Sequence, residues 1–208
     1  MPSAARKPRT AGRTTRDDWL RAALSVLIQE GVDSVKVLTL ADHLDCARSS
    51  FYWFFKDRAA ILDALLDNWE QTNTAALVEG CDAYAETVAE ALLNLISVFL
   101  DETRFEPRLD MAVRGWAQQS PAVAERVAQA DAARLGAIRA LFARFGFAPD
   151  EADVRARTVY LVQIGYIALQ IREALEDRMA RIPAYVKTYC GQSPTEAELA
   201  RFHARHGL

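Results

Sequence analysis

Residues 40–57 read LADHLDCARSSFYWFFKD, and this stretch decides the fold. Its apolar spacing predicts two short helices, over about 37–44 and 47–55, with the tight turn Asp45-Cys46 between them. Two short helices joined in this way form a helix-turn-helix. The apolar residues that can face one another and a preceding helix are Leu40, Ala41, Leu44, Phe51 and Phe55.

The other side of the second short helix carries side chains that suit a DNA groove. They are Arg48, Ser49, Tyr52 and Trp53. Arginine offers two donors to guanine, serine reaches bases or phosphates, and a tyrosine hydroxyl suits phosphate. Lys56 and Arg58, close to the start of the next helix, suit phosphates as well. The alternative interpretation makes each of these an ordinary surface charge or a packed aromatic side chain.

A helix is predicted upstream of this stretch. Thr15 and Asp18 resemble a capping box at its start. Apolar residues then recur at helical spacing from Leu20 to Ile28, and Gly31 is a natural stop.

Helical patterns also continue downstream to the end of the chain. Asp57 can cap a helix whose apolar stripe reaches Trp69. Later helices are predicted over about 86–103, 107–116, 121–145, 150–179 and 195–206. No alternating run of β-branched residues indicates a strand. The predicted class is therefore all-α, with an N-terminal three-helix helix-turn-helix domain and a C-terminal helical bundle. The predicted division is a flexible basic arm over 1–13, a DNA-binding domain over 14–58, and a ligand-binding and dimerisation domain over 59–208.

The charges are distributed unevenly along the chain. The net charge of the 208 residues is −3. Residues 1–58 contain 10 Lys and Arg against 7 Asp and Glu, whereas the remainder is acidic. A basic head on an acidic body suggests a polyanionic partner at the N-terminal end only. A chance excess contributed by a basic tail is the alternative.

The composition favours an ordered protein of the cytoplasm. Apolar residues make up 51% of the chain, but the most apolar run, 159–169, is too short to cross a membrane and contains Gln163. No signal peptide is visible. The three widely spaced cysteines suggest a reducing compartment and form no zinc pattern. His203 and His206 lie three apart on the last helix, and without a third ligand they indicate a surface face rather than a metal site.

With these residues in place, the sequence resembles the TetR/AcrR family of bacterial regulators over about residues 14–70. The elements that carry the resemblance are the apolar first helix, Leu40-Ala41-x-x-Leu44, Phe51-Tyr52-Trp53-x-Phe55, and Lys56-Asp57-Arg58 before a leucine-rich helix. The resemblance implies a homodimer with a small-molecule pocket in the C-terminal domain. The predicted DNA contacts are Lys36, Thr39, Arg48, Ser49, Ser50, Tyr52, Trp53, Lys56 and Arg58.

The sequence departs from the family pattern at three positions. Asp45 stands where the turn usually has glycine, and aspartate tolerates the left-handed conformation better than most residues. Phe54 stands where a phosphate-binding histidine is usual, so one DNA contact is expected to be lost. The second helix usually starts with threonine, and Lys36 nearby is expected to supply a phosphate contact instead.

The C-terminal domain offers a set of aromatic, apolar and polar residues for a ligand. An apolar cavity with a few polar groups is the usual form of a small-molecule site, although each such residue is more often simple core. The predicted ligand contacts are Trp69, Phe99, Arg104, Met111, Arg114, Trp116, Tyr160 and Gln163. No metal and no cofactor is expected.

A twofold homodimer is expected from apolar surface on the helices over about 121–146 and 151–178, with the last helix as an alternative contributor. The residues expected to face the second copy are Val159, Val162, Tyr166, Leu169 and Ile171. We also expect the helix that begins at Asp57 to link the DNA-binding head to the ligand site.

The sequence thus favours a transcription regulator, a repressor that a hydrophobic or amphipathic ligand releases from a double-stranded DNA operator. An enzyme is not expected, because the sequence has no Glu-x-x-His pair, Cys/His cluster or glycine-rich phosphate loop. The alternative is a helical interaction module that has lost DNA binding.

Overall fold

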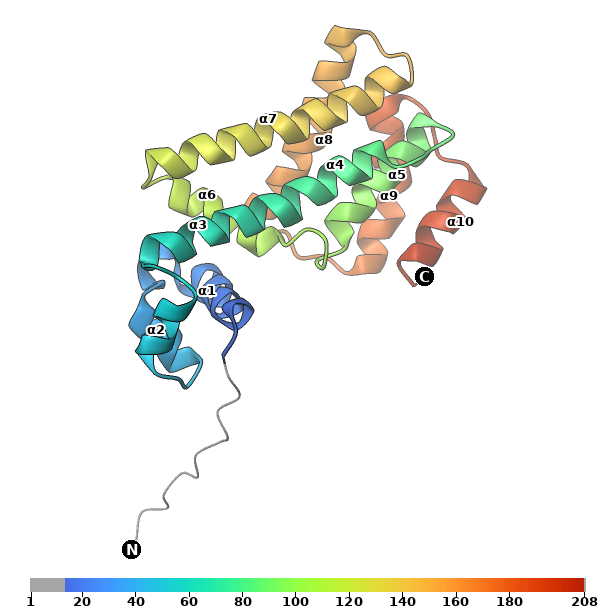
Figure 1. The fold of residues 1–208 in the computed structure, drawn as a ribbon. Helices are drawn as coiled ribbons and strands as arrows, with labels where there is room; N and C mark the ends of the chain where they lie inside the picture. Colours follow the sequence, from blue (N-terminus) through green and yellow to red (C-terminus); the bar gives the residue numbers. More distant parts are fainter. Residues whose placement is uncertain (1–13, 208) are drawn as a thin grey trace, which may run out of the picture. The chain divides into compact units, whose positions relative to one another are not determined.

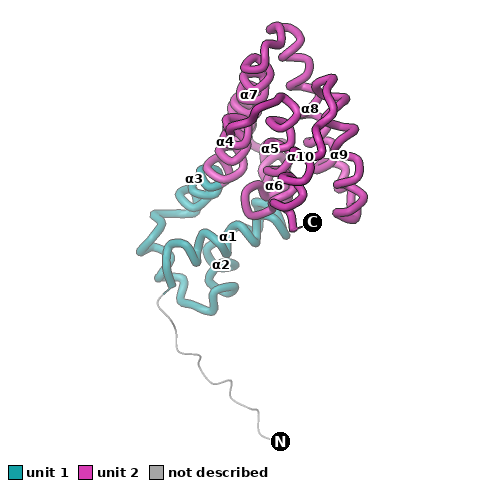
Figure 2. The backbone as a smooth tube through the Cα atoms, turned by 90° about the vertical axis from the view of Figure 1, so that its right-hand side faces the viewer, with its two compact units in different colours: residues 1–68 teal, residues 69–208 magenta. Residues whose placement is uncertain are grey.

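The computed structural model describes residues 14–207, and every regular element in that range is helical (Figure 1). The predicted all-α class is confirmed. The basic arm predicted over residues 1–13 lies outside the described residues. Contacts between Cα atoms divide the chain into two compact units, residues 1–68 and 69–208 (Figure 2).

The first unit is built from short helices whose ends follow from the sequence. Its elements are α1 (Arg16–Glu30), the 310 helix η1 (Val32–Ser34), α2 (Val37–His43), the 310 helix η2 (Arg48–Trp53) and α3 (Arg58–Trp69). The capping box predicted at Thr15 is present, because the Thr15 hydroxyl accepts from the Asp18 amide and the Asp18 carboxylate accepts from the Thr15 amide. Gly31 ends α1 with a φ of 85°, which favours glycine. The Asp57 carboxylate accepts from the Ala60 amide, so the predicted cap of α3 is confirmed.

The second unit is a bundle of longer helices around one apolar core. Its elements are the π-helical segment η3 (Glu70–Thr74), α4 (Ala75–Asp82), α5 (Val88–Leu100), α6 (Pro107–Ala117), α7 (Pro121–Arg144), α8 (Pro149–Ala168), α9 (Leu175–Cys190) and α10 (Glu196–Arg205). Helix α5 is apolar on almost every side and is buried along nearly all of its length. Helices α4, α7, α8 and α9 supply much of the rest of the core (Figure 1).

Two predicted helices differ from the structure. The single helix predicted over 150–179 is wrong, because the chain leaves the helix after Ala168 and re-enters one at Leu175. Gln170 takes a left-handed φ of 50° in the break, and the Ile171 amide donates to the Tyr166 carbonyl, which closes the end of α8. The second short helix is also tighter and shorter than predicted, a 310 helix over 48–53.

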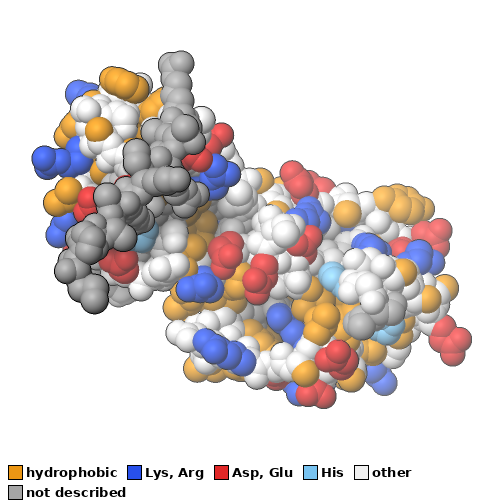
Figure 3. Space-filling model, turned by 90° about the horizontal axis from the view of Figure 1, so that it is seen from below, with side chains coloured by type: hydrophobic (Ala, Val, Ile, Leu, Met, Phe, Trp, Pro, Cys, Tyr) orange, Lys and Arg blue, Asp and Glu red, His pale blue; other side chains and the backbone are white. Residues whose placement is uncertain are grey.

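The surface of the second unit mixes both signs of charge. On the face shown in Figure 3, acidic and basic side chains are interspersed among apolar ones without a large area of one sign. Within residues 14–207, no helix combines the length and the apolar character needed to span a membrane.

Candidate functional site

An aromatic cluster fixes the second short helix of the first unit from its inner side. The Phe51 ring meets the edge of Trp19 at 5.2 Å between centroids and stacks with Phe55 at 5.5 Å. All three side chains are buried, as is Leu40 of α2. Aromatic pairs in these geometries contribute about 0.5–1.5 kcal/mol each beyond the area they bury. The cluster therefore sets which side of η2 faces outward.

The turn between α2 and η2 is closed by backbone contacts and by one strained residue. Asp45 has a φ of 49°, which confirms that an aspartate takes the left-handed position of this turn. The Cys46 amide then donates to the Ala41 carbonyl at 3.1 Å. The Ser50 hydroxyl donates to the Ala47 carbonyl at 2.7 Å, and Ser50 is buried.

The outward side of η2 carries large side chains that a soluble protein normally buries. Tyr52 is 60% exposed and Trp53 is 73% exposed, and Arg48, Ser49 and Lys56 are exposed beside them in sequence. Residues 51 and 55 point inward, so 52 and 53 are left on the outer side. An exposed aromatic pair with neighbouring cations favours an interaction surface over a solvated face. We call Arg48, Ser49, Tyr52, Trp53 and Lys56 the η2 face.

The remaining predicted DNA contacts lie in different surroundings. Lys36 is exposed at the start of α2, and Thr39 on the same helix is half-buried. Ser50 uses its hydroxyl inside the turn, as described above, and is turned away from the η2 face. Arg58 donates to the Val35 carbonyl at 2.6 Å and to the Val32 carbonyl at 2.7 Å, which ties α3 to the end of η1.

The second unit contains a buried network of charged groups around Asp110. Asp110 and Arg134 are both fully buried and pair at 2.9 Å. The other Asp110 oxygen accepts from Arg114 at 2.8 Å, and the indole N–H of Trp69 donates to Asp110 at 2.8 Å. Burial alone would raise the pKa of Asp110, but Arg134 and Arg114 outweigh it and hold this pKa below its usual value. Asp110 is therefore a carboxylate at neutral pH.

The network extends through Asp131 and Tyr160. Arg114 binds the two Asp131 oxygens at 2.9 and 2.6 Å, a bidentate pair. The Tyr160 hydroxyl donates to Asp131 at 2.5 Å and accepts from Arg114 at 3.1 Å. Burial raises the pKa of Tyr160 to about 12, so the hydroxyl keeps its proton. Two guanidinium groups thus balance two carboxylates.

One donor of this network has no partner among the described residues. The Arg134 guanidinium donates to the Thr74 hydroxyl and to Asp110, but its Nη2 atom is buried without a hydrogen-bond partner. The same guanidinium lies over the rings of Trp69, at 5.0 Å, and Phe105, at 5.6 Å. A buried donor without a partner is uncommon in folded proteins.

The comparisons with known proteins match the first unit most closely. The family described as bacterial regulatory proteins, tetR family, matches residues 20–65, which span the helix-turn-helix and the η2 face. Over these residues the chain is similar to the TetR family. The tetracycline repressor protein class A from transposon 1721 of Escherichia coli is 40% identical over 48 residues, which are 23% of this chain and 22% of that repressor. The chain therefore matches about a fifth of the length of this curated relative.

Solved structures resemble this chain along most of its length. AmtR of Mycobacterium smegmatis is 24% identical, with a TM-score of 0.63, over 97% of this chain and 99% of that one. KstR2 of Mycobacterium tuberculosis, named as a ketosteroid transcriptional regulator, is 18% identical, with a TM-score of 0.63, over 90% and 100%. The MbdR regulator of Azoarcus sp. CIB is 15% identical, with a TM-score of 0.65, over 86% and 98%. At these identities the likeness establishes the fold.

The structure gathers only some of the predicted ligand residues. Trp69, Arg114 and Tyr160 meet in the Asp110 network. Phe99 adjoins the network through Phe105, with ring centroids 4.9 Å apart. The other predicted residues lie apart from these contacts: Arg104 pairs with Glu79, Gln163 is buried beside Arg178, and Met111 and Trp116 are half-buried on α6.

Sequence reasoning missed the charged centre of the network. Asp110, Asp131 and Arg134 sit on helices where the pattern predicts solvated charges, yet Asp110 and Arg134 are fully buried. Helical spacing does place Asp131 and Arg134 one turn apart on α7, and Asp110 and Arg114 one turn apart on α6. That spacing was the one available signal, and it does not distinguish a surface pair from a buried one.

Proposed function

We propose that this chain is a transcription repressor of the TetR family that binds a double-stranded DNA operator as a homodimer and is released by a small amphipathic ligand. The observation that carries the DNA-binding part is the η2 face. Arg48 offers a two-donor fork for a guanine, and the Tyr52 hydroxyl and Lys56 ammonium suit phosphates on either side of a groove. The buried aromatic cluster holds this face in one orientation, so it needs little ordering when it docks.

The test of DNA binding is a gel-shift titration of the full chain against the DNA upstream of its own gene and against unrelated DNA of equal length. Arg48→Ala is expected to weaken operator binding by about 1–3 kcal/mol and to relax base preference at one position. Arg139→Ala is the matched control, because Arg139 is an exposed arginine of the second unit paired with Asp153. Equal binding by parent and Arg48→Ala, or no preference for the upstream DNA, contradicts the proposal and favours an interaction module without DNA binding.

The homodimer part rests on exposed apolar residues of α8, of the segment between α8 and α9, and of the first turn of α9. Leu161 is 61% exposed, Leu169 is 74% exposed, and Ile171 and Leu175 are also exposed. Val159, which the sequence assigned to the dimer face, is buried in the core of its own subunit, because α8 turns residues 156, 159 and 160 inward. A second copy burying the exposed side chains removes this apolar surface from water.

The dimer is tested by light scattering at micromolar concentration. Leu161→Glu is expected to shift the chain to monomer, since a carboxylate on this face would be buried without a partner. Tyr84→Glu is the control, because Tyr84 is 83% exposed between α4 and α5. A monomeric parent, or a dimer that Leu161→Glu leaves intact, overturns this part.

The effector part places the polar end of the ligand at the Asp110 network. The charges of that network already balance, so an uncharged acceptor such as a carbonyl or hydroxyl oxygen suits the open Nη2 atom of Arg134 better than an anion does. The apolar end of the ligand would contact the neighbouring aromatic rings, Phe99 and Phe105.

The test is a screen for compounds that release operator DNA, followed by titration of one such compound against Tyr160→Phe. This variant keeps the ring but removes the hydroxyl that helps orient Arg114 and Arg134, so the concentration for half-release is expected to rise about fivefold or more. Tyr84→Phe is the control. Unchanged release in Tyr160→Phe places the effector elsewhere, and no release by any compound contradicts ligand control.

A further inference from the structure

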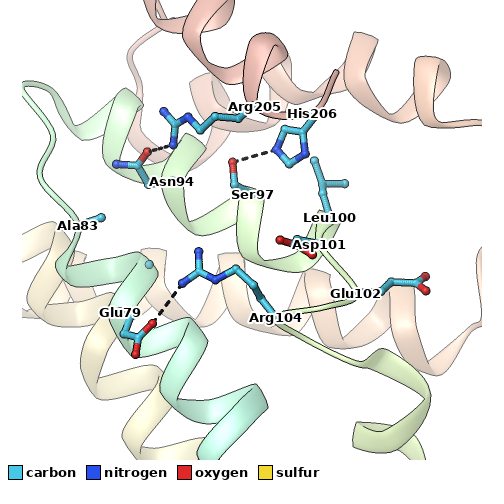
Figure 4. A pocket seen from close by; sticks show the side chains of 11 residues that line it. Glu79, Ala83, Asn94, Ser97, Leu100, Asp101, Glu102, Arg104, Arg205 and His206 are labelled. Atoms are coloured by element: carbon cyan, nitrogen blue, oxygen red, sulfur yellow. Dashed lines mark hydrogen bonds and ion pairs between the residues drawn. The ribbon is translucent and has the colours of Figure 1, made fainter. Parts of the chain in front are cut away.

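A pocket of about 600 Å³ lies in the second unit between α4, α5, the loop after α5 and α10 (Figure 4). Its volume falls in the range of sites for small molecules. It shares no residue with the Asp110 network. The side chains that matter for its chemistry are Glu79, Asn94, Ser97, Asp101, Arg104, Arg205 and His206.

Two guanidinium groups enter the pocket from opposite sides. Arg104 comes from the loop after α5 and pairs with Glu79 of α4 at 3.3 Å, and Arg205 comes from α10 and donates to the Asn94 side chain at 2.6 Å (Figure 4). The Arg104–Glu79 pair is partly exposed, and exposed pairs of this kind contribute little to stability. A ligand carboxylate can therefore engage Arg104 at small cost to the fold.

A carboxylate lies in the same pocket close to neutral polar groups. Asp101 lies below Ser97 and His206, whereas Glu102 points away from them (Figure 4). The Thr103 hydroxyl bond holds the pKa of Asp101 below its usual value, so this group is ionised. Burial lowers the pKa of His206, so its ring is mostly neutral at pH 7 while it contacts the Ser97 hydroxyl at 3.0 Å.

The pocket thus holds separated charges of both signs. Arg104 and Arg205 face Glu79 and Asp101, while a third lining carboxylate, Glu102, points away from them (Figure 4). A simple anion would meet the two carboxylates without compensation, and a simple cation would meet the two guanidiniums. An uncharged apolar ligand would desolvate all four charges and pair with none. A small ligand that carries both charges satisfies both sides at once.

We propose that this pocket binds a zwitterionic metabolite of the α-amino-acid class, with its carboxylate between Arg104 and Arg205 and its ammonium group at Asp101. The bound molecule ties α10 to α4 and α5. Helix α10 is also held by the Phe202 ring, which is buried in the core, and by polar contacts to α5 and its cap, among them Thr87 to Glu198 and Arg201 to Glu90. The site is independent of DNA binding, and its failure would leave the proposed repressor function untouched.

The experiment is isothermal titration of the full chain, without DNA, against each of the twenty common L-amino acids. For the tightest binder, the analogue lacking the amine and the analogue lacking the carboxylate are titrated in the same way. We expect at least one amino acid to bind and both analogues to bind about tenfold or more weakly, because each loses a charge-assisted contact. No binding by any amino acid at millimolar concentration, or equal binding by the analogue lacking the amine, overturns the proposal.

Three variants test the carboxylate contacts and the ammonium contact of the ligand separately. Arg104→Gln and Arg205→Gln are each expected to weaken the amino acid about tenfold, while Arg139→Gln leaves its affinity unchanged. Asp101→Asn is expected to weaken the amino acid but not the analogue that lacks the amine. Thermal unfolding of each variant checks that it folds. A folded Arg104→Gln with parental affinity, or an Asp101→Asn that weakens both compounds equally, refutes the assignment.

Discussion

Removing the carboxylate of Asp110 tests whether the buried network is held by its charges. Asp110→Ala leaves Arg134 fully buried with Thr74 and Tyr160 as its remaining partners, and it also leaves the Trp69 indole N–H without an acceptor. Removing one partner of a buried pair costs about 3–5 kcal/mol. The unsatisfied indole donor adds about 1–3 kcal/mol.

The expected loss of about 4–8 kcal/mol is large beside the 5–15 kcal/mol stability of a typical domain. It corresponds to a fall in Tm of about 10 °C or more for a chain of this size. Urea unfolding at pH 7, followed by circular dichroism and tryptophan fluorescence, measures it. Asp153→Ala is the control, because Asp153 pairs with Arg139 and Arg157 at the surface and is expected to matter little.

A double variant distinguishes charge from shape. Asp110→Leu with Arg134→Met removes both charges and keeps much of the volume, so it is expected to be more stable than Asp110→Ala by about 2 kcal/mol or more. Arg114 keeps its bidentate partner Asp131 in this variant. The reasoning is refuted if Asp110→Ala unfolds within about 1 kcal/mol of the parent, or if the double variant is less stable than Asp110→Ala.

The same pair predicts a pH dependence. The folded pKa of Asp110 is below its unfolded value, so its contribution to stability is complete above the unfolded pKa of about 4 and is lost as the pH falls through the folded pKa. The parent should therefore lose stability below about pH 4 more steeply than Asp110→Ala. Parallel acid-unfolding curves for the two proteins would contradict this assignment.

Three further outcomes follow from local geometry. Lys56→Ala should weaken binding to operator and unrelated DNA alike and reduce the slope of log affinity against log salt by about 1. An unchanged slope would show that Lys56 does not contact the DNA phosphates. Asp45→Val should destabilise the first unit by about 1–2 kcal/mol in urea unfolding, since a β-branched residue is strained at a φ of 49°. The control is Asp42→Val at an exposed position of α2. An effect of Asp45→Val no larger than that of the control would argue against strain. Gly80→Ala should destabilise the second unit by about 1–3 kcal/mol, because the added Cβ would lie 2.6 Å from Val98 Cγ2. In a Val98→Ala variant, which lacks that methyl group, Gly80→Ala should instead stabilise the helix. Destabilisation of similar size with and without Val98→Ala would contradict the clash.

Residues 14–70 could be interpreted from the sequence because their signals are local. Helix caps at Thr15 and Asp57, the stop at Gly31 and the left-handed turn at Asp45 each depend on a few neighbouring residues, and each is present in the structure. The inward side of the helix-turn-helix also followed, since Phe51 and Phe55 recur one turn apart and are buried together. Local hydrogen bonds, however, turned Ser50 inward, which the pattern alone did not predict.

The second unit depended on contacts that are distant in sequence. No glycine or proline marks the break between α8 and α9, and apolar residues recur on both sides of Gln170, so only the folded chain shows where the helix ends. Asp110 and Arg134 are 24 positions apart and look like surface charges in sequence, yet both are buried, and their pairing offsets the cost of removing them from water. Sequence determined most of the helices and the exposed aromatic face, because these arise from short-range periodicity. Tertiary structure decided which charges are buried and which helices enclose the pocket beneath α10, because desolvation and charge pairing depend on residues brought together only by packing.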